Sequence, residues 1–237
     1  MEKLSFNNVP FADLKNADLE VEWFKSFLAS NAKAIHKNSD LDQMLQALID
    51  FAKYSKSELD RLPSDEDFPD FIRDAVASSY IVRLLSKGYY KIQDEFSSHL
   101  ENFKGTEINL MRKASSSLER NKRWEFVIAL IFASICQSVE QGTPEPDVII
   151  KKKNIKWALP CKVLYSEKPG KQLQTIIKGI KQIQASEYHQ GIVMVNISNL
   201  INHENYFFKS KNEGEYYSYS NFEYAMSDFT KGNYGDF

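Results

Sequence analysis

A lysine at position 162 stands where the surrounding sequence predicts a largely buried β-strand. Between residues 155 and 165 apolar side chains occupy every second position, and Lys162 falls on the opposite face. An ammonium group in such a strand needs a carboxylate nearby, and Asp147 and Glu125 are the candidates. Such a group would be either a catalytic cluster or an ion pair that only stabilises the fold.

The cysteines and histidines argue against other kinds of reactive centre. Cys136 and Cys161 are far apart and lack the paired spacing of a zinc site or a disulfide framework. The four histidines are scattered, and no two of them are four residues apart as in a helical metal site. We therefore expect the cysteines to be core residues and the histidines to be solvated or loosely packed.

Charge is distributed unevenly along this chain of 237 residues, although its net charge is only −2. Residues 104–198 contain 15 Lys and Arg against 8 Asp and Glu, whereas the segments before and after them are acidic. A basic segment of this kind is typical of contact with an anionic partner such as a phosphate backbone. A solvated, lysine-rich face is the alternative explanation.

The apolar periodicity predicts different architectures along the chain. Residues 1–105 have apolar positions at helical spacing and are predicted to form a helical accessory region. Residues 106–201 predict the order helix, strand, strand, strand, helix, strand. These elements are expected near residues 124–136, 138–141, 147–150, 155–165, 171–185 and 191–198. Residues 202–237 are rich in Tyr and Phe, and we expect this extension to pack on the core, with stacking on unpaired bases as the alternative.

Two of the predicted elements carry more specific expectations. In helix 171–185 the apolar side should face the protein, and it includes Leu173, Ile177 and Ile180. Strand 191–198 is continuously apolar, which predicts a central strand covered on both faces.

These residues and this order of elements resemble the PD-(D/E)XK nuclease superfamily. The resemblance rests on Glu125 in the first core helix, on Pro146 and Asp147 opening a strand, and on Cys161 and Lys162 in the next strand. It covers roughly residues 118–200. It implies an α/β (α+β) fold, with a restriction-endonuclease-like αβββαβ core whose mixed sheet is flanked by helices, preceded by an all-helical N-terminal region.

In that family the acidic side chains bind Mg²⁺ or Mn²⁺, and the lysine lies beside the attacked phosphate. The resemblance implies that Asp147 is a metal ligand, that Cys161 offers its backbone carbonyl, and that Lys162 activates water or stabilises developing charge. Two residues before Lys162, where the family has Asp or Glu, this chain has Pro160.

Another carboxylate must therefore complete the metal site. Helix 171–185 contains no Asp or Glu, so Glu125 is the best substitute as metal ligand and catalytic residue, and Glu140 and Glu145 are poorer ones. The alternative for Glu125 is a solvent-facing position on its helix, beside Lys122 and two arginines.

The basic residues around this site are candidates for contact with nucleic acid. They are Lys156, Lys171, Lys178, Lys181 and Gln182. In the family, a Lys or Gln of the second helix often faces the active centre, which singles out Lys178 and Gln182.

The function that follows is a metal-dependent nuclease that hydrolyses DNA phosphodiester bonds, of the restriction or phage-defence kind. The alternative is a degenerate nuclease-fold module that binds nucleic acid or a protein without cleavage. We expect DNA rather than RNA as the partner, and a second copy or a partner protein on the helical N-terminal region. Because the chain lacks both a membrane-spanning stretch and a secretory signal, we expect a cytoplasmic protein without membrane contact.

Overall fold

The computed structural model describes residues 17–31, 35–55, 68–104, 108–143, 145–188 and 190–200, together with two short strands near the C-terminus. The chain divides into two compact units, Met1–Ser86 and Lys87–Phe237. The sequence-based boundaries at residues 105 and 201 remain predictions. Within the described ranges no helix is long and apolar enough to cross a membrane.

The described part of the first unit is helical, as its apolar periodicity predicts. It contains α1 (Ala17–Asn31), α2 (Asp40–Ser55) and most of α3 (Phe68–Gly88). Helix α1 buries Val21, Phe24 and Phe27, which lie three or four residues apart and so share one face. A salt bridge of 2.7 Å between Lys25 Nζ and Asp42 Oδ1 joins α1 to α2.

The second unit begins with short helices that pack on a long buried one. These are η3 (Tyr89–Lys91), α4 (Gln93–Phe96), η4 (Ser97–Lys104) and α5 (Leu118–Ala133). Ser117 starts α5 as its N-cap, since its side chain accepts a hydrogen bond from the Arg120 N–H. Phe126 is fully buried in α5, where its ring contacts Phe96 and Phe103. Residues Phe126–Leu130 of α5 are all buried, so this stretch of the helix is covered on every side.

The strands of the second unit up to residue 196 form a three-stranded antiparallel sheet and a two-stranded parallel sheet, which an isolated bridge between Ala158 and Gly191 links. They are β1 (Ser138–Gln141), β2 (Val148–Lys152), β3 (Ile155–Leu159), β4 (Cys161–Val163) and β5 (Met194–Asn196). Strands β1, β2 and β3 pair antiparallel in that order, and β4 pairs parallel with β5. The turn between β2 and β3 is made by Lys153 and Asn154, whose positive φ angles of 50° and 61° suit a two-residue hairpin.

Strands β3 and β4 act as one strand interrupted at Pro160. The parallel pairing of Ala158 with Gly191 has the same register as that of Cys161 with Met194. The Met194 N–H donates to the Pro160 carbonyl at 2.8 Å, so the ladder continues past the proline. With β3 and β4 counted as one strand, the elements follow the predicted order, and the first strand lies at 138–141 as expected. That they form a restriction-endonuclease-like core remains a prediction.

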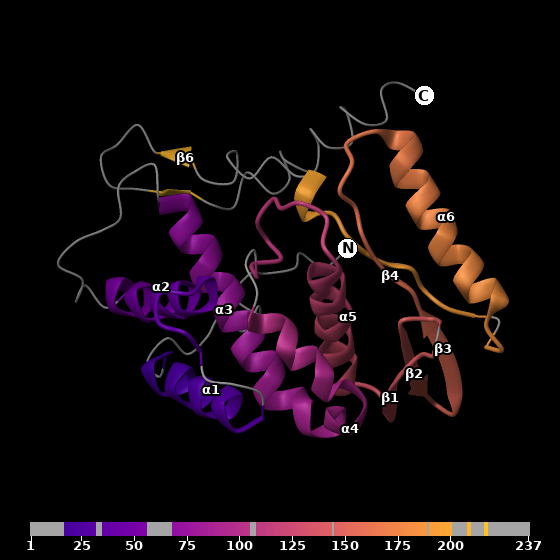
Figure 1. The fold of residues 1–237 in the computed structure, drawn as a ribbon, viewed down its shortest axis with the longest axis horizontal. Helices are drawn as coiled ribbons and strands as arrows, with labels where there is room; N and C mark the ends of the chain where they lie inside the picture. Colours follow the sequence, from indigo (N-terminus) through magenta and orange to yellow (C-terminus); the bar gives the residue numbers. More distant parts are fainter. Residues whose placement is uncertain are drawn as a thin grey trace. The chain divides into compact units, whose positions relative to one another are not determined.

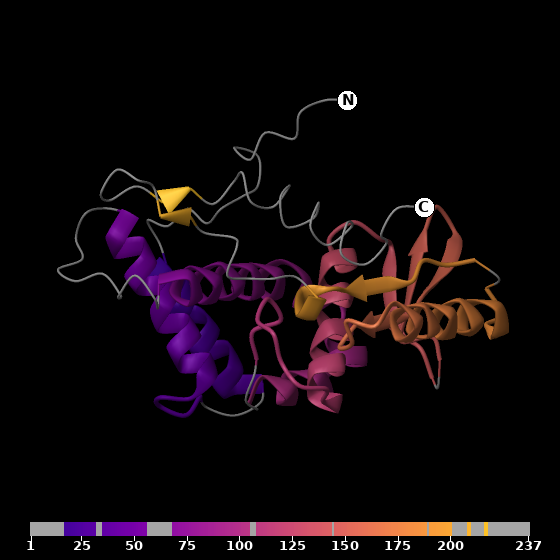
Figure 2. The same ribbon diagram turned by 90° about the horizontal axis from the view of Figure 1, so that it is seen from above.

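Helices cover the strands of this unit. Strand β4 runs between α5 and α6 (Pro169–Ala185), and α6 lies alongside the strands when seen from above (Figures 1 and 2). The Trp124 indole of α5 donates a hydrogen bond of 3.1 Å to the Met194 carbonyl, which ties α5 to β5. The chain then forms η5 (Ser198–Leu200), and two strands pair further on, β6 (Phe208–Lys209) and β7 (Tyr216–Tyr217). The predicted packing of the rest of 202–237 lies outside the described residues.

Two expectations about this part of the fold are wrong. Strand β5 is not a central strand, since within the described residues it pairs only with β4 and Ile192 beside it is 50% exposed. Helix α6 buries Gln172 and Gly179, while Leu173 is 58% exposed. The reason is a close contact, because a Cβ on Gly179 would lie 2.7 Å from Val193 Cγ1. The helix therefore approaches the strand with the face that contains Gly179, and part of its apolar side is turned outward.

Candidate active site

The partner of Lys162 is Asp147. The Lys162 Nζ atom of β4 lies 3.1 Å from Asp147 Oδ2, just before β2, and the two side chains are 17% and 16% exposed. The half-buried ammonium group thus has the carboxylate that its place in the strand requires. Of the three charged residues singled out from the sequence, these two are in direct contact.

Asp147 is held where the antiparallel ladder ends. Val148 is the last β2 residue in register, opposite Leu159, so the continuing register places Asp147 opposite Pro160. The next N–H, that of Cys161, donates to Asp147 Oδ2 at 2.7 Å instead of to a backbone carbonyl. The loop before Asp147 is tight, because a Cβ on Gly142 would lie 1.5 Å from the Pro146 carbonyl oxygen.

Glu125 is buried rather than solvent-facing, with an exposure of 5%. Its Oε2 atom lies 2.6 Å from Lys122 Nζ on the same helix and 3.6 Å from His99 Nε2, slightly beyond hydrogen-bonding distance. Burial raises the pKa of Glu125, but the interactions with His99 and Lys122 outweigh this effect and leave the pKa below its ordinary value. Glu125 is therefore ionised at neutral pH, and its direct partners are not those of Asp147.

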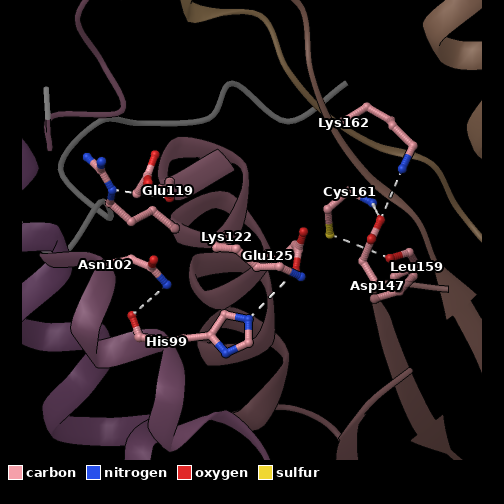
Figure 3. Close-up of polar contacts among 10 residues, drawn as sticks. His99, Asn102, Glu119, Lys122, Glu125, Asp147, Leu159, Cys161 and Lys162 are labelled. Atoms are coloured by element: carbon pink, nitrogen blue, oxygen red, sulfur yellow. Dashed lines mark hydrogen bonds and ion pairs between the residues drawn. The ribbon is translucent and has the colours of Figure 1, made fainter. Parts of the chain in front are cut away.

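Cys161 lies between the two carboxylates (Figure 3). Burial raises the pKa of its thiol well above the ordinary value, and the negative charges of Asp147 and Glu125 raise it further, while Lys162 and Lys122 lower it. All four charged groups thus act on one buried sulfur. The candidate active site is defined here as Glu125, Asp147, Cys161 and Lys162.

The raised pKa predicts that the Cys161 thiol is inert. Because only the thiolate reacts appreciably with alkylating reagents, iodoacetamide at pH 8 should leave Cys161 unmodified in the folded protein and modify it after denaturation. The half-buried Cys136 serves as an internal reference in the same mass-spectrometric measurement. Rapid modification of Cys161 in the native state would show that the thiol is exposed or ionised.

The oxygen atoms of this site are chemically suited to a magnesium ion. Both hydrogen bonds to Asp147 reach Oδ2 and both contacts to Glu125 reach Oε2, so Oδ1 and Oε1 accept no hydrogen bond from the described residues. In an extended strand the N–H and the C=O of one residue point to the same side. The Cys161 carbonyl therefore points to the side on which the Cys161 N–H faces Asp147. Magnesium prefers such hard oxygens and retains several waters. Over the described ranges, however, no three His, Cys, Asp or Glu side chains gather as a metal site.

The candidate nucleic-acid contacts are distributed over two elements. Lys171, Lys178 and Lys181 are exposed on α6, whereas Gln182 is half-buried, and its Oε1 has no hydrogen-bond partner among the described residues. Lys156 on β3 is already paired, with its Nζ 2.8 Å from Glu140 Oε2 of β1 and 5.7 Å from the centre of the Tyr188 ring.

Glu140 should therefore compete with a phosphate for Lys156. Replacing Glu140 with Gln removes one negative charge and releases the ammonium group, so we expect DNA affinity at low salt to rise about threefold to tenfold. The slope of log affinity against log salt should also steepen by about one. Fluorescence anisotropy of a labelled duplex measures both, and unchanged affinity would exclude Lys156 from the interface.

Glu125 has two partners outside this site, His99 and Lys122, and His99 was not expected from the sequence. The prediction that the histidines are solvated or loosely packed is wrong for His99, which is 2% exposed. Nothing in its local sequence indicates a contact with Glu125, which is 26 positions further along the chain. Lys122 was named beside Glu125 from the sequence, and a residue three positions earlier on a helix shares its face.

Comparison of the chain with protein-family models, curated proteins and solved structures finds no match. The function is therefore argued from the site itself.

Proposed function

We propose that the chain is a metal-dependent nuclease that hydrolyses DNA phosphodiester bonds, with Asp147 and Lys162 at its centre. The observation that carries this proposal is the contact between Lys162 Nζ of β4 and Asp147 Oδ2, which lies just before β2. It is supported by the order helix, three strands, helix, strand, which is that of the PD-(D/E)XK core. A role in restriction or phage defence is the biological setting we propose for such an enzyme.

In this proposal Asp147 holds the Lys162 ammonium group in one place. A rigid ammonium group beside a phosphate stabilises the negative charge that develops on its oxygens during attack by water. The chain supplies this charge from a half-buried position, where it is screened less than on the surface.

A magnesium or manganese ion would be held by Asp147 Oδ1 and the Cys161 carbonyl, with Glu125 Oε1 nearby. When bound, it would lower the pKa of a water molecule and neutralise charge on the phosphate. Glu125 is ionised because Lys122 and His99 lower its pKa against the effect of burial, so its oxygen carries the negative charge that attracts a cation.

Lysines of α6 would supply sequence-independent contacts to the DNA backbone. Lys171, Lys178 and Lys181 are exposed along this helix, and residues 104–198 as a whole are basic. Such contacts position a duplex without reading its bases, and they weaken as salt increases.

The second candidate function is a module that binds nucleic acid without cleaving it. It is favoured by the balance of charge in the site, where Lys122 neutralises Glu125 and Lys162 neutralises Asp147. Pro160 adds no carboxylate opposite Asp147. A divalent cation would then be attracted mainly by the phosphates of bound DNA, as is common for magnesium.

Cleavage and binding must be measured on the same preparation to separate the two functions. Supercoiled plasmid and linear duplex DNA are incubated with the chain in magnesium, in manganese and in EDTA, and a gel-shift assay records binding. The nuclease proposal expects nicked and linear plasmid in the metals and intact plasmid in EDTA. Binding without cleavage under every condition would overturn it and support the second candidate.

A further inference from the structure

We propose that His99 is a positioning residue for Glu125, and that it acts by donating the proton on Nε2 to Glu125 Oε2. This inference rests on the proposed function, because it gives the buried carboxylate a role in the site. It concerns a residue of η4, outside the strands and the helix that carry the other site residues.

The first observation is the surroundings of His99. Its ring centre lies 5.1 Å from that of Phe96 and 5.9 Å from that of Phe126, and the side chain is 3% exposed. Neither ring nitrogen has a hydrogen-bond partner among the described residues. Burying an imidazole N–H without a hydrogen-bond acceptor is unfavourable, so the unsatisfied ring nitrogens of His99 require an explanation.

The second observation is the direction in which the ring points. Nε2 lies 3.6 Å from Glu125 Oε2, and Figure 3 shows the imidazole directed at this carboxylate from the side opposite to Cys161. A small movement would convert the contact into a hydrogen bond to a charged acceptor, which is stronger than one between neutral groups.

The geometry around Glu125 shows what such a hydrogen bond would achieve. Lys122 and His99 both approach Oε2, which leaves Oε1 for a ligand. Lys122 is 35% exposed and belongs to the same helix as Glu125, so its flexible side chain fixes the carboxylate weakly. His99 comes from a different element and is held by two aromatic rings, so it would fix the rotation of the carboxylate.

The tautomer of His99 tests this directly. The chain of 237 residues is labelled with ¹⁵N, and long-range ¹H–¹⁵N correlations of the imidazole rings are recorded near pH 7.5, with His99→Gln used to assign the signal. We expect a proton on Nε2 and a shift of the ring signals in Glu125→Gln. A proton on Nδ1 alone, with bare Nε2 facing Glu125, would overturn the proposal.

Metal binding gives a second readout that a purely structural role would not change. Manganese affinity is measured by electron paramagnetic resonance of the free ion, with Mn²⁺ alone as the probe. We expect His99→Phe to weaken binding about tenfold or more, and His99→Gln, which retains a donor, to restore most of it. Phe103→Leu perturbs the same aromatic cluster at Phe126 but removes neither a donor nor a ring that contacts His99, and it should lower Tm while leaving manganese affinity unchanged.

The outcomes separate this inference from the proposed function. Equal manganese affinities for His99→Phe, Phe103→Leu and the unmodified chain would overturn the positioning role while leaving the metal site in place. If the unmodified chain bound no manganese, the metal-dependent function would fail instead. The tautomer measurement would then still decide the His99–Glu125 contact, since it needs neither metal nor DNA.

Discussion

Replacing Asp147 with Asn should abolish metal-dependent cleavage while leaving the chain folded. Asparagine has nearly the shape of aspartate and keeps an oxygen to accept the Cys161 N–H, but it loses the charge that holds Lys162 and attracts a cation. Removing a single charged group of this kind costs about 10²–10³ in rate. Single-turnover cleavage of a labelled duplex and thermal unfolding of the same sample measure the two effects.

Asp147→Ala serves as the contrast to Asp147→Asn. It leaves both the Cys161 N–H and the half-buried Lys162 ammonium group without their acceptor, so we expect unfolding to become easier by about 2–4 kcal/mol. If Asp147→Asn cleaved DNA as fast as the unmodified chain, Asp147 would have only a structural role at the end of the strand. If Asp147→Ala were as stable as the unmodified chain, the hydrogen bond from the Cys161 N–H to Asp147 would contribute nothing to the free energy of unfolding.

Replacing Pro160 with Glu should create a stronger metal site. Position 160 follows in register opposite Asp147, so the new carboxylate would share its face of the sheet. It would also face Gly179 of α6, since an added Cβ at Gly179 lies 3.5 Å from Pro160 Cβ. Because the two carboxylates now present are each neutralised by a lysine, one more negative charge should tighten manganese binding about tenfold or more.

The stability of this variant should depend on metal. Position 160 is buried, so without a cation the added carboxylate destabilises the fold by about 1–3 kcal/mol, and manganese should reverse this loss. Glutamate also restores an N–H that the parallel register aims at the Ile192 carbonyl, a bond that proline cannot make. Pro160→Gln restores the same N–H without the charge, and equal manganese-dependent Tm shifts in the two variants would contradict the explanation.

The order of elements could be predicted because alternation and helical spacing are local properties. The alternating run at 155–165 predicted both the strand and the place of Lys162 on its opposite face. Because a lysine in a buried strand needs a carboxylate nearby, Asp147 could be named as a partner. Even the short strand at 138–141 followed, since the two later strands needed an element between them and the buried helix.

The features that could not be predicted from the sequence depend on contacts between distant segments. The rotation of α6 follows from the close approach of Gly179 to Val193, which helical periodicity does not reveal. The burial of His99 against Phe96 and Phe126 depends on how η4 packs on α5. The pairing of Glu125 with Lys122 has a different origin, because Lys122 lies three positions before it on the same helix and the contact is local.

The most direct test of the central claim is the single-turnover rate of duplex cleavage by Lys162→Met, with protein in excess over DNA so that binding is saturated. Methionine keeps much of the length and apolar volume of the lysine side chain but removes its charge. Lys113→Met is the matched control, because its ammonium group pairs with Glu167 at the surface, where both side chains are more than two-thirds exposed. We expect Lys162→Met to cleave about 10²–10³ times more slowly in magnesium and Lys113→Met to cleave at the unmodified rate. Equal rates for all three proteins would contradict a catalytic centre built on Asp147 and Lys162.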